Sequence, residues 1–253
     1  MRRVLPTRPI DHLRIRVQPT RTVRTAVVCL PAGTAPVDMP RRAAAVLTTV
    51  GVPSVGVLPR FAVNVQHRPW RVKNLVDCWQ GLTSGGPVRL LDLARMRATA
   101  ATTADVEWHV WNQLVHGTKP AEPFWVYLDR FRGDPDRHPL ARVQAEYRSQ
   151  PRIMAMAAHN AATRTTGCPV PMLPTSAVET FQAGHYTYVA AARLAAVPGD
   201  AFASVTGRWM TSASGRLVDT LAFLTAANAH LDEMPSDSQL VAVASPAGDG
   251  GVR

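Results

Sequence analysis

The sequence is poor in lysine and in long hydrophobic runs. Lys73 and Lys119 are its only lysines, against 26 arginines. Together with the many alanines, this bias is typical of a GC-rich genome, and we expect a bacterial source. No run approaches the ~18 apolar residues that a membrane-spanning helix requires, so we expect no membrane partner. The start of the chain also lacks the apolar core of a secretory signal.

Cysteines are few, and no two of them have the spacing of a metal or redox site. The three are Cys29, Cys78 and Cys168. An odd, scattered set argues against a disulfide framework and indicates a reducing compartment, so we expect a cytoplasmic protein.

Signatures of catalytic and metal sites are also missing. There is no Gly-x-Ser-x-Gly nucleophile elbow. There is also no Glu-x-x-His pair of the kind that binds metals in helical bundles. His109 and His116 lie two helical turns apart, too far for one ion. We therefore expect no metal site and no cofactor.

Acidic residues are almost absent from the first 73 residues. This part contains 13 basic residues but only Asp11 and Asp38 as acids, a net charge of +11, whereas the remainder carries 15 basic and 16 acidic residues. Such asymmetry indicates an anionic partner: nucleic acid, an acidic protein or a phosphate-bearing ligand. The alternative is a solvated arginine-rich arm that only keeps the protein soluble.

Two basic stretches carry this charge. In the first, Arg14 and Arg16 alternate with apolar residues, which favours a half-buried strand over an organellar transit peptide. In the second, FAVNVQHRPWRVK at 61–73, aromatic and basic residues are interleaved; such residues can stack on bases and neutralise phosphates. The alternative is an exposed strand whose aromatic residues fold back on the core. The expected nucleic-acid-binding residues are Arg14, Arg16, Arg68, Trp70, Arg71 and Lys73.

The pattern of residues 23–58 predicts a β-α-β unit. The continuous apolar run at 23–30 suits a strand covered on both faces, a helix follows from 38 to 50, and a second apolar run covers 52–58. The loop PAGTAPVD lies where the first strand ends, the edge at which open α/β sheets bind ligands. Its single glycine, Gly33, falls short of the phosphate-binding fingerprints, so we expect a plain turn.

The rest of the chain reads as mainly helical. Ser84-Gly85-Gly86-Pro87 predicts a hinge, a hairpin is expected around Gly207, and residues 240–244 suit an edge strand. We therefore expect an α+β fold, with α/β as the alternative. In it, a basic β-α-β segment (1–86) packs on a predominantly helical body (87–240). The composition of residues 245–253 predicts a disordered tail.

Four expected helices each place one polar residue on their apolar side: Glu107, Asn160, His185 and Asn228. Glu107 lies in TTADVEWHVWNQLVH, where the spacing of Thr102 and Asp105 indicates a helix start. The alternative is that this helix is continuous with one that begins at residues 90–96. A buried carboxylate is costly unless it is paired. His185 is its natural partner by type, and such a pair can act as general acid and base. The alternative is a satisfied polar network that fixes the register of the helices.

Three functions follow from these patterns. The first is a cytosolic nucleic-acid-associated protein that binds phosphates through its arginine-rich N-terminal part. The second is an enzyme that uses Glu107 and His185 on a small or anionic substrate at the junction of the two parts. The third is an interaction module for an acidic protein. The residues alone favour the first.

Overall fold

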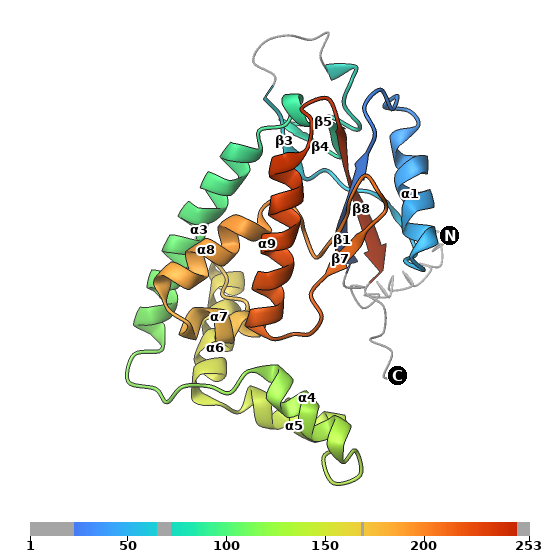
Figure 1. The fold of residues 1–253 in the computed structure, drawn as a ribbon. Helices are drawn as coiled ribbons and strands as arrows, with labels where there is room; N and C mark the ends of the chain where they lie inside the picture. The colour runs from blue at the N-terminus through green and yellow to red at the C-terminus, as the bar shows by residue number, and fades with distance from the viewer. Residues whose placement is uncertain (1–22, 65–71, 168–169, 247–253) are drawn as a thin grey trace, which may run out of the picture.

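The fold contains a mixed sheet of six strands (Figure 1). The computed structural model describes residues 23–64, 72–167 and 170–246. The strand order is β2 (Gly56–Val57), β8 (Gln239–Pro246), β1 (Val23–Leu30), β6 (Ala201–Ala203) and β7 (Trp209–Thr211), and β5 (Gly85–Pro87) also pairs with β8. β1 and β6 are parallel, whereas β8 is antiparallel to β1, β2 and β5. β3 (Phe61–Ala62) and β4 (Leu82–Thr83) form a separate pair.

The N-terminal β-α-β unit is present, with another strand inserted into it. Helix α1 (Met39–Thr49) connects β1 to β2. These two strands run in the same direction because each is antiparallel to β8, which lies between them. In β1, alternate side chains point to opposite faces of the sheet. Val27 and Cys29 join the core under α9 (Leu217–Glu233), whereas Ala26 and Val28 join the core under α1. The apolar run at 23–30 is therefore a strand covered on both faces, as expected.

Two segments have a different role from the one that their sequence suggests. The stretch at 240–244 is not an edge strand, because β8 lies between β1 and the strands β2 and β5 and its residues 239–243 are buried. The stretch Ser84–Pro87 is not an open hinge, because Gly85–Pro87 form β5 against β8. Glycine is needed there for close approach: a Cβ on Gly85 would lie 2.5 Å from the carbonyl oxygen of Leu240.

The other regular elements of the described chain are helices. They are η1 (Val88–Leu90), α3 (Leu93–Leu114), α4 (Phe124–Gly133), α5 (Leu140–Arg148), α6 (Pro151–Thr166), η2 (Thr175–Ala177), α7 (Val178–Gln182) and α8 (His185–Ala195). Figure 1 shows α1 on one side of the sheet, α9 on the other, and α4 and α5 farthest from it. With 50% helix and 16% strand in a mixed sheet, the α+β class is confirmed.

Helix α3 begins earlier than its sequence indicates. The expected start at Thr102 is wrong, since the hydroxyl of Thr102 donates to the carbonyl of Ala98 inside a continuous helix. The helix starts after Asp92, whose carboxylate accepts a hydrogen bond from the backbone N–H of Arg95. An N-terminal cap of this kind satisfies a donor that has no partner within the helix. The whole helix therefore reaches from the sheet to the distal helices.

Candidate functional site

A crevice opens at the edge of the sheet where β1 and β5 end. Gln239, the first residue of β8, pairs with Leu30 of β1 on one side and with Pro87 of β5 on the other. From this edge β1 leads to α1, which covers one face of the sheet, while β5 leads through η1 to α3, whose first turn packs on the other face. Open α/β sheets bind ligands where neighbouring connections diverge in this way.

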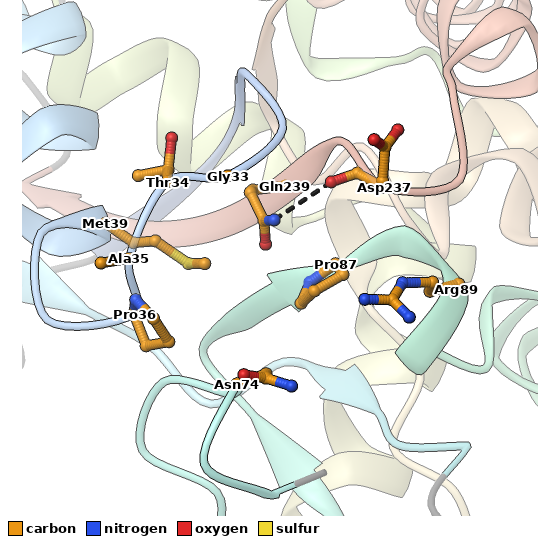
Figure 2. A pocket seen from close by; sticks show the side chains of 10 residues that line it. All are labelled: Gly33, Thr34, Ala35, Pro36, Met39, Asn74, Pro87, Arg89, Asp237 and Gln239. Atoms are coloured by element: carbon orange, nitrogen blue, oxygen red, sulfur yellow. Dashed lines mark hydrogen bonds between the residues drawn. The ribbon is translucent and has the colours of Figure 1, made fainter.

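The crevice contains a hollow of about 410 Å³. Residues from the β1–α1 connection, from the segment around β5 and from the start of β8 line it (Figure 2): Gly33, Thr34, Ala35, Pro36, Met39, Asn74, Pro87, Arg89, Asp237 and Gln239. Three separate stretches of the chain thus meet there. Such convergence at a concave surface is typical of small-molecule sites.

Gln239 is the most informative residue of the hollow. The residue is buried, with only 5% of its surface exposed. Its Nε2 donates to the carbonyl of Asp237 at 3.1 Å, which fixes the orientation of the amide (Figure 2). Its Oε1 has no hydrogen-bond partner among the described residues. Because buried polar atoms are nearly always paired, an unpaired acceptor in the wall of a hollow indicates a place for a donor from a ligand.

Charged and polar side chains surround this acceptor. Arg89 and Asp237 are both exposed and bring opposite charges to the hollow, and Asn74 adds an amide. The backbone N–H of Arg89 donates to the carbonyl of Ser236 at 2.9 Å, so η1 and the segment before β8 are held together. The arrangement suits a polar ligand with an anionic group near Arg89 and a donor near Gln239.

The β1–α1 connection forms the opposite wall as a tight turn, as its single glycine indicates. The buried Thr34 hydroxyl donates to the carbonyl of Pro31 at 2.9 Å. Gly33 adopts a φ of +77°, in the left-handed region that glycine enters without steric cost. This turn places residues 34–36 over the hollow, with Met39 buried beneath them.

Most of the expected nucleic-acid-binding residues lie outside the described residues. This applies to Arg14, Arg16, Arg68, Trp70 and Arg71. Lys73 is described and exposed, and it directly precedes Asn74 in the wall of the hollow. The end of the basic stretch at 61–73 is therefore next to the site at the sheet edge.

Glu107 and His185 both lie where α3 packs against α8, but each bonds to another residue. The carboxylate of Glu107 accepts a hydrogen bond from the hydroxyl of Tyr188 at 2.6 Å. His185 Nε2 lies 2.7 Å from Oδ1 of Asp105. The structure therefore contains a carboxylate–imidazole pair, formed by Asp105 and His185. An acid–base role for Glu107 and His185 stays a prediction.

The two asparagines have separate partners. Asn160 exchanges two hydrogen bonds of 2.7 Å with the backbone of Leu173. Asn228 donates to the carbonyls of Leu194 and Leu224 and accepts from Arg97. Each of the four polar residues thus has a hydrogen-bond partner of its own and holds a helix to a neighbouring segment.

Asp105 and His109 belong to a cluster that the pattern of a single helix does not reveal. They are four residues apart on α3, and His185 reaches them from α8. The signal within the sequence is the Asp-x-x-x-His spacing, which puts two side chains on one helix face. The third member comes from a helix 76 residues further on, which no local pattern reveals.

Comparisons with known proteins add no family or relative. No protein-family model, no curated protein and no solved structure matches the chain. Of the helices in residues 23–64, 72–167 and 170–246, none has the length and hydropathy to span a bilayer.

Proposed function

We propose that the chain binds a small polar molecule in the hollow at the carboxyl edge of the sheet. The observation that carries this proposal is the buried, unpartnered Oε1 of Gln239 in the wall of the hollow. Leaving such an acceptor without a partner costs about 1–3 kcal/mol. A ligand N–H or O–H that bonds to Oε1 removes this cost, and Arg89 can pair with an anionic group of the same ligand.

The residues of the hollow favour binding over nucleophilic catalysis. Among the ten lining residues there is no cysteine, serine or histidine, and the one hydroxyl, that of Thr34, donates to Pro31. The small anionic substrate that the sequence suggests at the junction of its two parts is the same class of ligand. In the hollow, this ligand would lie away from Glu107 and His185.

A thermal-shift screen of the full chain tests this function. The panel contains amino acids, nucleosides, nucleotides and sugar phosphates, and each compound that raises the melting temperature is then titrated by calorimetry. Gln239→Leu should weaken binding of such a compound by about 5- to 150-fold, which corresponds to about 1–3 kcal/mol. The matched control is Gln113→Leu, at an exposed position of α3, and it should bind like the wild type.

Two results would contradict the proposal. One is a screen in which no compound class raises the melting temperature. The other is a ligand whose affinity is the same in the wild type and in Gln239→Leu.

A second function, nucleic-acid binding, is favoured by the charge distribution. We propose that residues 1–73, with a net charge of +11, bind nucleic acid mainly through its phosphates. The few cysteines of the chain fit a cytosolic location for this activity. Because cations released from the phosphates drive such binding, affinity should fall steeply as salt is added.

The test compares two variants with equal net charge. In one, Arg14, Arg16, Arg68 and Arg71 are changed to Gln; in the other, the exposed Arg137, Arg148, Arg164 and Arg193 are changed to Gln. Only the first should lose affinity for single- and double-stranded probes and reduce the salt dependence. Equal losses in both variants, or binding that does not change with salt, would overturn this function. A partner that co-purifies after nuclease treatment would instead indicate an acidic protein.

A further inference from the structure

Three potential metal ligands meet on the surface where α3 crosses the start of α8. They are Asp105, His109 and His185, and one ligand atom from each lies within 4.8 Å of the other two. Oδ1 of Asp105 is 2.7 Å from Nε2 of His185 and 3.7 Å from Nδ1 of His109. Two imidazoles and one carboxylate are a donor set that suits zinc and related transition metals.

We propose that these three side chains bind one divalent transition-metal ion, with zinc as the physiological candidate. In a tetrahedral site with bonds of 2.0–2.1 Å, neighbouring ligand atoms are about 3.3 Å apart. The separations of 2.7 and 3.7 Å lie on either side of this value. The third separation, between the two imidazoles, is at most 4.8 Å, so the side chains must rotate to bring all three ligand atoms to this spacing. Three protein ligands leave a fourth position for water or another molecule.

The backbone on both sides of the cluster is already held in place. Trp108, between the two α3 ligands, donates from Nε1 to the carbonyl of Phe181 at 3.1 Å and so fixes the end of α7. One turn further along α8, the hydroxyl of Tyr188 donates to Glu107. The two contacts fix the position of His185 relative to α3. A site whose supports are formed before the ion arrives loses little entropy on binding.

The three ligand side chains can be reached from solvent. The side chains of Asp105, His109 and His185 are 49%, 61% and 43% exposed, which leaves an open path for a hydrated ion.

Without an ion, the same groups form only surface hydrogen bonds or ion pairs. Pairs of this kind contribute little to stability, because water and salt screen them. A bound ion instead connects α3 to α8 through three coordinate bonds and stabilises the folded state by an amount that grows with the concentration of free ion. The two alternatives therefore differ in what added metal does to the protein.

The experiment uses the full chain, stripped of metal by a chelator that is then removed. Zn²⁺ is titrated by calorimetry, and Co²⁺ is titrated by its visible absorption, whose intensity reports tetrahedral geometry. One high-affinity ion per chain should bind, and Zn²⁺ should raise the melting temperature by several degrees. Mg²⁺, which prefers six oxygen ligands, should do neither.

Variants assign the site to these residues. His109→Ala, His185→Ala and Asp105→Asn should each weaken Zn²⁺ binding at least about tenfold and abolish the tetrahedral Co²⁺ spectrum. The matched control is His116→Ala, which removes an exposed histidine just after the end of α3. This variant should bind Zn²⁺ like the wild type. Circular dichroism of each metal-free variant separates loss of the site from loss of the fold.

The fluorescence of Trp108 provides an independent test of the site, because it reports the ion itself and not the folded state of the variant. Its ring centroid lies 5.1 Å from that of His185 and 5.6 Å from that of His109. Ni²⁺ or Co²⁺ in the site should therefore quench its fluorescence, and Trp108→Phe should remove this quenching while Zn²⁺ still binds. Absence of Zn²⁺ binding, or binding that all three ligand variants retain, would overturn the proposal.

Discussion

The hydroxyl of Tyr188 donates to Oε2 of Glu107 at 2.6 Å and joins α8 to α3. This bond accounts for a carboxylate on the apolar side of α3, where it would be costly without a partner. Tyr188 is itself buried and stacks on Phe181, with ring centroids 4.0 Å apart. Burial raises the pKa of Tyr188, and the hydrogen bond to the Glu107 carboxylate raises it further. Together they keep the phenol protonated as the donor.

The first prediction concerns this pair. Tyr188→Phe leaves the Glu107 carboxylate partly buried without its donor, and we expect it to lower the free energy of unfolding by about 1–3 kcal/mol. Urea denaturation measures this change. In a Glu107→Leu background the same Tyr188→Phe change should cost much less, since no carboxylate is left unpaired. The control Tyr186→Phe, at a position 86% exposed, should leave stability unchanged.

The second prediction concerns the close contact of β5 with β8. A Cβ on Gly85 would lie 2.5 Å from the carbonyl oxygen of Leu240, so Gly85→Ala must push the strands apart. We expect a loss of about 1–3 kcal/mol, typical of overpacking. Gly215→Ala is the matched control, because its Cβ would meet nothing within 4 Å. Equal thermal unfolding of the two variants would show that β5 is not packed tightly on β8.

The third prediction concerns Arg60, whose guanidinium caps the C-terminal end of α8. It donates to the carbonyls of Ala195, Ala196 and Val197 at 3.0–3.3 Å, carbonyls that have no partner within a helix. Burial lowers the pKa of Arg60, and the nearby Asp200 opposes this shift. Arg60→Met keeps the apolar stem but removes all donors, and we expect a loss of about 2 kcal/mol in urea denaturation.

Two further variants separate the role of the guanidinium from that of charge. Arg60→Lys should restore only part of the stability, since one ammonium cannot reproduce the planar set of donors. Arg42→Met, on the exposed surface of α1, removes the same charge and should have almost no effect. If Arg42→Met costs as much as Arg60→Met, net charge and not the end of α8 is the cause.

The elements that the sequence revealed are those that depend on local patterns. Residues 26–30 of the run at 23–30 have no polar position to turn toward water, and they form the buried part of the strand. Gly207 predicts a turn, and it adopts a φ of +79° in the hairpin of β6 and β7. Likewise, the partly buried position of Glu107 required a partner, although its chemistry allowed either a tyrosine or a histidine.

The features that the sequence did not reveal depend on contacts between distant segments. β8 pairs with β1 although more than 200 residues separate Leu30 from Gln239 along the chain. Neither strand carries a local signal for its neighbour, so the central position of β8 and its contribution to the hollow could not be anticipated. The cluster of Asp105, His109 and His185 depends in the same way on how α3 packs against α8.

The fourth prediction concerns stability at alkaline pH. Burial raises the pKa of Tyr147 to about 12, and it raises the pKa values of Tyr127 and Tyr188 as well. In the unfolded chain, tyrosine ionises near pH 10. The stability that these protonated phenols contribute is therefore complete below about pH 10 and is lost as the pH rises through about 12, because the unfolded state then binds fewer protons.

Tyr147→Phe tests this sign directly. At neutral pH the variant should be less stable than the wild type by about 1 kcal/mol, since it loses the 2.6 Å hydrogen bond from the Tyr147 hydroxyl to the carbonyl of Thr175. Above pH 10 the wild type loses stability through Tyr147 and the variant does not. The difference between their free energies of unfolding, measured in urea from pH 7 to pH 11, should therefore shrink. A difference that stays constant or grows would show that Tyr147 ionises as readily in the folded protein as in the unfolded chain.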